Sequence, residues 1–442
     1  MTLKHYAERK NLWEIAMPIN DSTAILVHNR ATTGVWAFMS LFVGATLAWP
    51  LSSEGAAYAG WAVGNVWDGY GTILRSTDSG VSWSRQGVGQ LAGGSLSGVA
   101  TVNPDTAWVV GDSNGGYATI YHTTDGGLTW NRKGSAAQVP DTSLLKVTSF
   151  GNDNIWAVGS GTILHSADGG ATWANQIPAG YEGVHLQGVY TPDGINVWAT
   201  GGPLNGGHAT ILKSGDGGLN WTRQEGGDIH LLDHILGVSA VNADTAWVMG
   251  GTVGAQEWMV QKTSNGGLTW TLQNSGQNDG NNVYAVNLST IWAVSDYTIQ
   301  RTIDGGTNWN GSSSQYYTMG ISAVDSLQAW AVSQGQFGTI FHTIDGGTSW
   351  AKLTQLGGEA LPGLENVSFS TEAIPEPSSA VLLVIGLAAM TGGLFISVPT
   401  PRRPRSPATA RVGWNMSRPM TAGCVPRRWA RRCISWMARA SR

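Results

Sequence analysis

The segment GTILHSADGGATW (residues 161–173) ends in the motif that decides the fold of this chain. The motif occurs seven times, as STDSGVSW (76–83), TTDGGLTW (123–130), SADGGATW (166–173), SGDGGLNW (214–221), TSNGGLTW (263–270), TIDGGTNW (302–309) and TIDGGTSW (343–350). The closing tryptophans of successive copies are 47, 43, 48, 49, 39 and 41 residues apart. A second tryptophan precedes every copy, in AGWAVG, TAWVVG, NIWAVG, NVWATG, TAWVMG, TIWAVS and QAWAVS. The period is close to the length of one four-stranded blade of a β-propeller.

Each repeat unit is predicted to contain four short strands. In the second unit, apolar strands are expected over 96–102 and 107–111, an alternating strand over 119–123, and the start of a fourth over 129–132. The motif is then the hairpin turn between the third and fourth strands, where its glycines supply positive φ angles and its acid accepts backbone N–H groups. The sequence therefore predicts an all-β fold, a seven-bladed β-propeller with four-stranded blades.

The two ends of the repeat region are predicted to share one blade. The first motif lacks the preceding strand that the other units have, and LENVSF (364–369) matches the first-strand pattern seen at 144–150. We expect this C-terminal strand to complete the first blade. A ring closed in this way has no open radial edge at which aggregation could begin.

The motif resembles the Asp-box, or BNR repeat, of sialidases, sortilin-type receptors and some glycoside hydrolases. The longer unit is most similar to that of the photosystem II assembly/stability factor family, and the resemblance covers residues 60–373. It implies a propeller whose boxes are structural and lie away from any active site. The box positions given a structural role on this basis are Asp78, Asp125, Asp168, Asp216, Asn265, Asp304 and Asp345. Asn265 departs from the acidic pattern but keeps a side-chain acceptor.

Residues 1–59 are predicted to be an export signal, followed by one propeller domain over 60–373. An uncharged and mostly apolar run covers 35–49 after Arg30, and Ala57-Tyr58-Ala59 offers a small-x-small cleavage site. An uncleaved membrane anchor is the alternative interpretation.

The segment 374–405 resembles the PEP-CTERM sorting signal of Gram-negative bacteria. It begins IPEPSS, continues as an uncharged run over 380–398, and ends in an arginine cluster, Arg402, Arg403 and Arg405. At about 1.5 Å per residue the run is just long enough to cross a bilayer as a helix. The resemblance implies a membrane span at 380–398 before processing, an exosortase-type processing enzyme as a partner, and a location in the cell envelope, on the outer surface or in the extracellular matrix.

Residues 406–442 continue beyond the arginine cluster at which such proteins usually end. They are rich in Arg and Trp and contain no acid. We interpret this basic tail as a disordered segment or as the product of a frameshift or mispredicted stop. A nucleic-acid-binding arm is the alternative.

The charge of the repeat region argues against nucleic acid as a partner. The whole chain has a formal net charge of −4, whereas residues 60–373 hold 10 Lys and Arg residues against 24 Asp and Glu residues, which gives −14. An acidic propeller disfavours a phosphate backbone. Both cysteines, Cys424 and Cys433, lie in the tail, so the propeller has no thiolate ligand. We expect no cofactor and no metal, although 228–234 is rich in His and Asp, the metal-type ligands.

Strand order predicts which face of the ring carries function. Turns between the first and second strands share a face with the boxes, and the longer connections share the opposite face. Loops on a rigid scaffold commonly carry function. The residues predicted there to bind a ligand are Trp67, Tyr70, Tyr181, Trp258, Tyr316, Tyr317, Asp228 and Asp233. Aromatic rings with nearby acids commonly hold sugars or peptides.

Several enzyme classes lack the residues that they need. A sialidase requires an arginine cluster and usually an early Arg-Ile-Pro motif, but the repeat region has five arginines and no such motif. No P-loop, nucleophile elbow or zinc-protease motif occurs, and no feature nominates a carboxylate pair. We therefore expect no catalytic residue, and an exported, envelope-associated, non-catalytic binding or scaffold propeller for exopolysaccharide or a protein partner. The alternatives are a polysaccharide-active glycoside hydrolase or lyase, and an assembly factor related to the photosystem II family.

Overall fold

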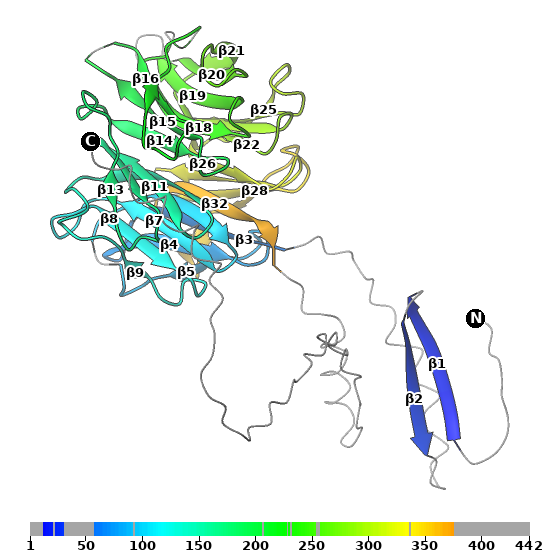
Figure 1. Ribbon diagram of the computed structural model, residues 1–442. Coiled ribbons are helices and arrows are strands. Elements are labelled where there is room, and N and C mark those ends of the chain that lie inside the picture. The colour runs from blue at the N-terminus through cyan, green and yellow to red at the C-terminus, as the bar shows by residue number, and fades with distance from the viewer. Residues whose placement is uncertain are drawn as a thin grey trace, which may run out of the picture. The chain divides into compact units, whose positions relative to one another are not determined.

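The computed structural model of the chain describes residues 12–20, 23–30, 57–91, 93–205, 207–227, 229, 232–252, 257–335 and 337–374, the first two ranges for their backbone. These residues form strands, turns and loops, and no α-helix occurs among them. Seven four-stranded sheets follow one another along the chain as the blades of a β-propeller (Figure 1). The predicted all-β, seven-bladed propeller with four-stranded blades is confirmed.

The blades are numbered I to VII, and the strands of each blade are antiparallel and named A to D in sheet order. Blade I contains β32 (Leu364–Ala373), β3 (Tyr58–Trp67), β4 (Tyr70–Ser76) and β5 (Ser84–Gln86). Blade II contains β6 (Leu96–Asn103), β7 (Thr106–Gly111), β8 (Thr119–Thr123) and β9 (Asn131–Arg132). Blade III contains β10 (Leu144–Phe150), β11 (Asn154–Gly159), β12 (Thr162–Ser166) and β13 (Ala174–Asn175). Blade IV contains β14 (Leu186–Tyr190), β15 (Val197–Pro203), β16 (Ala209–Ser214) and β17 (Thr222–Arg223).

The remaining blades follow the same order. Blade V contains β18 (His234–Ala240), β19 (Ala246–Thr252), β20 (Glu257–Thr263) and β21 (Thr271–Gln277). Blade VI contains β22 (Gly280–Ala285), β23 (Ile291–Ser295), β24 (Thr298–Thr302) and β25 (Asn310–Ser313), and blade VII contains β26 (Tyr317–Ala323), β27 (Ala329–Gln334), β28 (Thr339–Thr343) and β29 (Ala351–Leu353). Two hairpins lie outside the blades, β1 (Leu12–Asn20) with β2 (Thr23–Arg30) and β30 (Gln355–Leu356) with β31 (Glu359–Ala360). The A strands of neighbouring blades contact one another and form the inner ring.

Blade I closes the ring by joining the two ends of the repeat region. β32 pairs antiparallel with β3, so that Trp61 lies opposite Ser368, as the adjacent orange and blue strands of Figure 1 show. The N–H of Ile374 also donates to the carbonyl of Ala57 at 2.7 Å. The predicted completion of the first blade by a C-terminal strand is confirmed. β3 begins at Tyr58, two residues before the domain boundary expected at residue 60.

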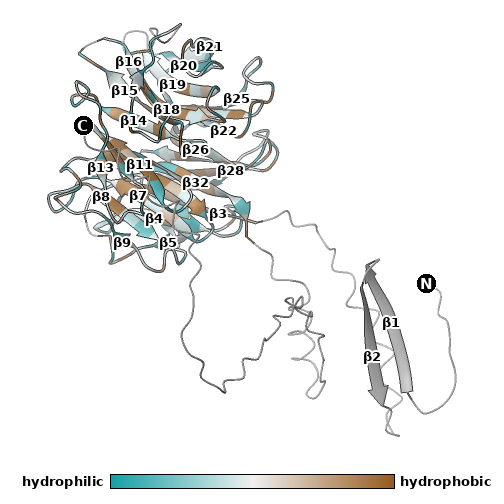
Figure 2. Ribbon diagram, viewed as in Figure 1, coloured by the Kyte–Doolittle hydropathy of each residue, from teal (hydrophilic) through white to brown (hydrophobic). Residues whose placement is uncertain are grey.

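The hydrophobic core lies between the blades. Each of the seven clusters of buried side chains combines residues of two adjacent blades. In several interfaces the strand-B tryptophan of one blade meets the box tryptophan of the next edge-on, as Trp61 meets Trp130 with ring centroids 5.4 Å apart. Such aromatic pairs contribute about 0.5–1.5 kcal/mol beyond the burial of their surface. The brown, hydrophobic segments of Figure 2 accordingly lie along the strands of the blades.

A basic residue lies opposite the strand-B tryptophan in every blade. It immediately precedes the Ser or Thr that opens the box. The seven cross-strand pairs are Trp61–Arg75, Trp108–His122, Trp156–His165, Trp198–Lys213, Trp247–Lys262, Trp292–Arg301 and Trp330–His342. Arg and Lys at this position also reach the next blade, since Arg75 Nη1 donates to the carbonyl of Gly126 at 2.6 Å and Lys213 Nζ to that of Ala243 at 2.7 Å. These cations therefore connect neighbouring blades by hydrogen bonds.

The predictions for the chain ends fall largely outside the described residues. This applies to the apolar run 35–49, to all but the first residue of the sorting segment 374–405 with its span at 380–398, and to the tail 406–442. Among the residues that the structure describes, no helix is long and apolar enough to cross a membrane.

Candidate functional site

The two faces of the ring carry different connections. In blades II to VII the N–H of the glycine that follows the box acid, or Asn265, donates to a carbonyl of the A–B turn in the same blade, as Gly126 does to Asp105 at 2.9 Å and Gly346 to Leu327 at 2.9 Å. The boxes and the A–B turns therefore share one face, called here the box face. The B–C turns and the connections between blades lie on the opposite face, called the loop face.

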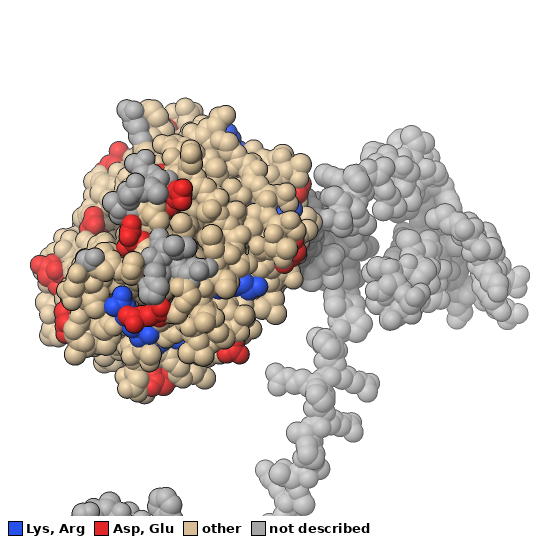
Figure 3. Space-filling model, turned by 90° about the horizontal axis from the view of Figure 1, so that it is seen from above, with Lys and Arg blue, Asp and Glu red and all other residues tan. Residues whose placement is uncertain are grey.

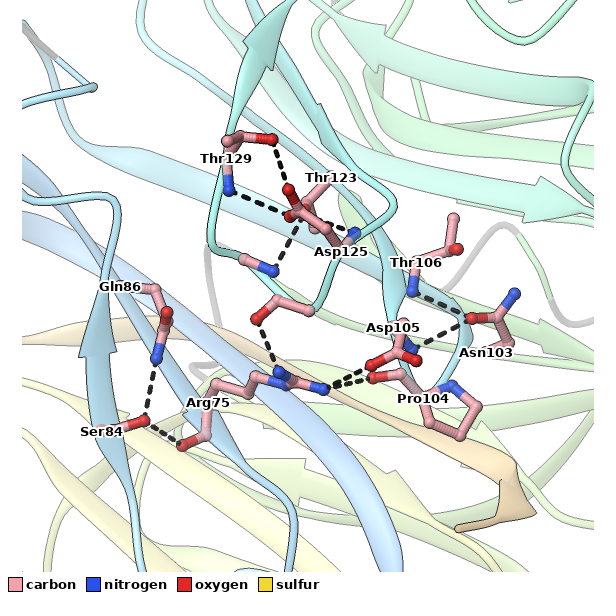
Figure 4. A network of polar contacts seen from close by, with 12 residues as sticks. Arg75, Ser84, Gln86, Asn103, Pro104, Asp105, Thr106, Thr123, Asp125 and Thr129 are labelled. Carbon is pink, nitrogen blue, oxygen red and sulfur yellow. Dashed lines mark hydrogen bonds and ion pairs between the residues drawn. The ribbon is translucent and has the colours of Figure 1, made fainter. Parts of the chain in front are cut away.

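The box acids hold their own turns. In blade II, Asp125 Oδ1 accepts the N–H of Thr129 at 2.9 Å and the hydroxyl of Thr123 at 2.9 Å, while its Oδ2 accepts the hydroxyl of Thr129 at 2.6 Å (Figure 4). These hydrogen bonds lower the pKa of Asp125 to about 2. The same contacts recur at Asp78, Asp168, Asp216, Asp304 and Asp345. These hydrogen bonds all lie within the turn of the box, as expected for an acid that holds the turn in shape.

The fifth box keeps this geometry without a charge. Asn265 Oδ1 accepts the hydroxyl of Thr263 and the N–H of Thr269, each at 3.0 Å. Its Nδ2 donates to the hydroxyl oxygen of Thr269 at 2.8 Å, which reverses the direction of one hydrogen bond. The turn in blade V therefore depends on the positions of the polar atoms and not on a negative charge.

Two of the predicted ligand-binding residues flank one tight turn on the loop face. Trp67 and Tyr70 lie opposite each other at the end of the β3–β4 hairpin, with Asp68 (φ 51°) and Gly69 (φ 83°) between them. The guanidinium of Arg85 lies 4.4 Å over the ring of Trp67 and pairs with Asp68 at 2.9 Å. One face of the Trp67 ring is therefore already occupied by a cation.

Other predicted residues are less available than expected. Tyr181 and Tyr316 are half-buried and pack against the interblade clusters, Tyr316 with its ring 5.5 Å from that of Phe341. Trp258 was expected on an exposed loop, and this expectation is wrong. It lies in β20, is 3 % exposed and belongs to the core between blades V and VI, because the glycines at 276 and 280 leave room for its ring.

The two predicted aspartates have different outcomes. Asp228 lies outside the described residues. The N–H of Asp233 donates to the carbonyl of Gly251 at 3.0 Å, next to the start of β18. His234, the residue that follows, leads into the polar group described next.

Tyr317 is the predicted residue that takes part in a larger polar group, which we call the acid–tyrosine cluster. Its members lie at the loop-face ends of blades V, VI and VII and are His234, Asp279, Asn281, Asp296, Tyr297 and Tyr317. The rings of Tyr297 and Tyr317 meet edge-on with centroids 6.3 Å apart, and the hydroxyl of Tyr317 hydrogen-bonds to Asp296. This group brings two aromatic rings and two carboxyl groups together.

Amide and imidazole groups fix the two acids. Asn281 Nδ2 donates to Asp296 Oδ1 at 3.0 Å and to the carbonyl of Thr318 at 2.8 Å. The N–H of Asp279 donates to Asp296 Oδ2 at 3.4 Å, and His234 Nε2 lies 3.8 Å from Asp279 Oδ1. The cluster is therefore built on the starts of β18, β22 and β26 together with the short turn between β23 and β24, and not on long loops.

The cluster has a buried base and an exposed rim. Burial raises the pKa of Asp296, the neighbouring charge of Asp279 raises it further, and the hydrogen bond from Asn281 opposes both. Burial, together with Asp296, raises the pKa of Tyr317 to about 12. Asp296 is 8 % exposed, whereas Tyr297 is 46 % exposed and the side chain of Asp279 is 43 % exposed. A ligand would therefore meet a tyrosine ring and a carboxylate first.

Sequence reasoning missed Asp279, Asp296 and Tyr297. It searched the long connections, whereas Asp296 and Tyr297 form a two-residue turn between β23 and β24. A usable signal was present, because an acid follows the strand-B pattern directly in TIWAVSD and again at Asp112 in TAWVVGD. Among the residues that the structure describes, no group of three or more His, Cys, Asp or Glu side chains could hold a metal ion.

The charge of the surface matches the composition of the repeat region. In the view of Figure 3, acidic side chains occur at many points of a mostly neutral surface and basic side chains at few. This agrees with the net charge of −14 counted over 60–373. The cluster thus lies on an acidic protein.

Fold, repeat and box geometry together define a BNR-type β-propeller. A family model described as photosynthesis system II assembly factor YCF48 matches residues 96–182, which include blades II and III. No curated protein matches the sequence significantly.

Solved structures resemble the chain at low identity. A YCF48 bound to D1 peptide is 17 % identical over 58 % of this chain and 80 % of that one, with a TM-score of 0.45. A GH74 enzyme of Niastella koreensis is 16 % identical over 69 % and 58 % of the two chains, with a TM-score of 0.43. A protein from Lactobacillus plantarum is 11 % identical over 72 % of this chain and 100 % of that one, with a TM-score of 0.50. At these identities the likeness concerns the fold alone.

Proposed function

We propose that this protein is a non-catalytic binding propeller whose acid–tyrosine cluster takes a basic segment of a protein partner. The observation that carries the proposal is the edge-on pair of Tyr297 and Tyr317 beside Asp279 and Asp296. Exposed tyrosine supplies contact area at low conformational cost, and carboxylates attract Lys and Arg. The base of the cluster is held by Asn281, so little ordering is needed on binding.

Two further observations support a protein ligand. Long-range attraction of a basic segment is favoured by the net charge of −14 over 60–373. The family model that matches 96–182 describes an assembly factor, a class of protein that acts on other proteins. An exopolysaccharide, held by stacking on the same tyrosines, is the competing ligand.

Binding arrays test the proposal directly. The full-length protein is applied to one array of basic, neutral and acidic peptides and to one array of bacterial glycans. We expect binding to basic peptides that weakens as salt is raised, because exposed charges are screened. Binding to neutral glycans that is insensitive to salt would instead support the polysaccharide ligand.

Variants locate the binding surface. Tyr297→Ala and Asp279→Asn should each weaken peptide binding about tenfold or more, since they remove exposed contacts of the cluster. Tyr70→Ala, on the same face in blade I, is the matched control and should leave binding unchanged. Equal effects of Tyr297→Ala and Tyr70→Ala would exclude the cluster as the site.

A glycoside hydrolase is the second candidate, and one observation favours it. Asp296 has a raised pKa beside the exposed Asp279, and such enzymes use two carboxyl groups of which one stays protonated. Release of reducing sugar from a polysaccharide by the wild-type protein, lost in Asp296→Asn, would establish it. Binding without release in any substrate of the glycan array would exclude it for those substrates.

We also propose that the chain is exported to the cell envelope, with 374–405 acting as a PEP-CTERM-like signal for an exosortase-type enzyme. The order IPEPSS, apolar run and arginine cluster supports this. Cleavage after residue 59 would remove Tyr58, whose N–H donates to Ser79 Oγ at 3.0 Å and whose carbonyl accepts from Ser79 N at 3.0 Å. We therefore place processing before Ala57, which N-terminal sequencing of the envelope fraction would test.

A further inference from the structure

A cavity that is partly open to solvent runs along the axis of the ring. It has a volume of about 310 Å³ and is lined by the A strands of all seven blades. An apolar cavity of about 150 Å³ can hold benzene, and ligand pockets begin near 300 Å³. The axial cavity is therefore large enough for a small organic molecule.

The pairing of each A strand with its B strand shifts register near the start of the A strand. The first A-strand residue after this shift lies at the same level of the ring in every blade. These residues are Asn366, Gly98, Lys146, Gly188, Gly237, Asn282 and Gly320, in blades I to VII. Four are glycine, and the other three all carry nitrogen donors. The level therefore combines open space with three donor side chains.

The glycines make room for the donor-bearing strands. A Cβ atom at Gly98 would lie 3.0 Å from Cα of Lys146, and one at Gly237 would lie 2.7 Å from Cα of Asn282. A Cβ atom at Gly320 would likewise lie 3.0 Å from Cα of Asn366. Lys146, Asn282 and Asn366 therefore each lie next to a glycine of the preceding blade, which presents no side chain at this level of the ring.

The two asparagine amides have donors without protein acceptors. Asn282 Oδ1 accepts the N–H of Val283 at 2.9 Å, and Asn366 Oδ1 accepts that of Val367 at 2.8 Å. No described residue accepts a hydrogen bond from either Nδ2 group, although Asn366 is only 7 % exposed. Neither Nδ2 group is a fully buried atom, and both residues line the cavity, so both donors are accessible to a molecule in it. An acceptor in the cavity can therefore bond to them.

Lys146 adds a positive charge at the same level. Among the described residues it is the one charged side chain that lines the cavity. Burial lowers the pKa of Lys146 to about 8, and the charge of Glu365 opposes that shift. Glu365 is itself held by Gln334 Nε2 at 2.6 Å, but neither of these two residues lines the cavity. An ammonium group has three N–H donors, so it can serve Glu365 and a second anion together.

We propose that the axial cavity binds a small organic carboxylate, whose oxygens accept from Lys146 Nζ, Asn282 Nδ2 and Asn366 Nδ2. Hydroxyl groups farther along the axis, at Thr148, Ser149 and Ser368, hold the rest of the molecule. The site is separate from the acid–tyrosine cluster, and its existence does not depend on the peptide ligand.

Calorimetry with a size series of probes tests the site. Acetate, succinate and citrate are titrated into the full-length protein, with acetamide and succinamide as neutral controls. We expect saturable binding of a carboxylate, at least about tenfold tighter than of the matching amide, because the amide lacks the negative charge. No saturable binding of any carboxylate, or equal binding of succinate and succinamide, would overturn the proposal.

Matched substitutions separate the cavity from the overall charge. Lys146→Met and Asn366→Asp should each abolish carboxylate binding, whereas Lys352→Met and Asn310→Asp change the charge equally on outer strands and should retain it. Asn282→Asp is the second cavity variant if Asn366→Asp does not fold, as judged by its melting transition. Binding that survives in the folded cavity variants would exclude the assigned donors.

Discussion

Trp108 and His122 lie directly opposite each other on β7 and β8, and their rings stack with centroids 3.9 Å apart. Burial lowers the pKa of His122 to about 4, so the ring is neutral at pH 7. Blade I has Arg75 at the equivalent position, and its guanidinium also reaches the next blade through Gly126 and Asp105 (Figure 4). The histidine blades therefore have the stack without the hydrogen bonds between blades.

Substitution of His122 by arginine should supply those hydrogen bonds. Blade III offers the equivalent acceptors, because Gly169 and Asp153 are placed as Gly126 and Asp105 are in blade II. We expect His122→Arg to raise the melting temperature at pH 7, measured by scanning calorimetry. The control is His122→Gln, which adds no cation. A melting temperature no higher than that of His122→Gln would mean that the interface gains nothing from the cation.

The same histidine predicts a loss of stability in mild acid. The pKa of His122 is about 4 in the folded protein against 6.5 in the unfolded chain, so the unfolded chain binds the extra proton first. The contribution of neutral His122 to the free energy of unfolding is therefore fully present above about pH 6.5 and is lost as pH falls toward 4. Urea unfolding at pH 7, 5.5 and 4 should show this loss, and His122→Gln should reduce it. An unchanged pH dependence in His122→Gln would contradict the assignment.

The box of blade III separates the roles of shape and charge. Asp168 has a pKa of about 2 because the side chain and N–H of Thr172 hydrogen-bond to it. Its contribution is therefore present above about pH 4 and is lost as pH falls through 2. Asp168→Asn, the pattern of Asn265, should keep most of the stability at pH 7 and weaken the acid dependence. Asp168→Ala should lower the melting temperature, because Thr172 then loses its acceptor. Equal melting temperatures for the two variants would contradict the turn-holding role.

Two truncations test the closure of the ring. Deletion of 361–373 together with everything after it removes β32, which leaves β3 with an unpaired edge and should lower the melting temperature and promote aggregation. Deletion of 375–442 keeps β32 and the hydrogen bond of Ile374 and is the matched control. Thermal unfolding and light scattering compare the two. Similar stability of both would show that the ring does not need its last strand.

The fold was predictable because its signals repeat in phase. A tryptophan before and after each glycine turn recurs seven times, and the unpaired pattern at 364–369 identifies the closing strand. The basic residue before each box was equally visible in the sequence, from Arg75 to His342, but its meaning depends on the pairing of strands B and C. A repeat period is visible in the sequence itself. Stacking of two rings on neighbouring strands can be predicted only when the register of those strands is known.

The candidate site was less predictable because it is built across blades. Tyr317 was predicted as a ligand-binding aromatic residue, but Asp296 belongs to a turn too short to attract attention. Trp258 looked like a loop residue and is buried, because β20 begins one residue earlier, at Glu257, and places the ring between blades. The cluster combines side chains from three blades, and the residue spacing within a single repeat does not indicate that these side chains lie close together.

The pairing of β3 with β32 also orders events during synthesis. The ribosome makes β3 near the start of the chain and β32 after the seventh blade, some three hundred residues later. Blade I stays incomplete for all of that time, at about 5–20 residues per second. The native ring can close only after β32 has left the ribosome, so blade I stays incomplete while the other six blades are made.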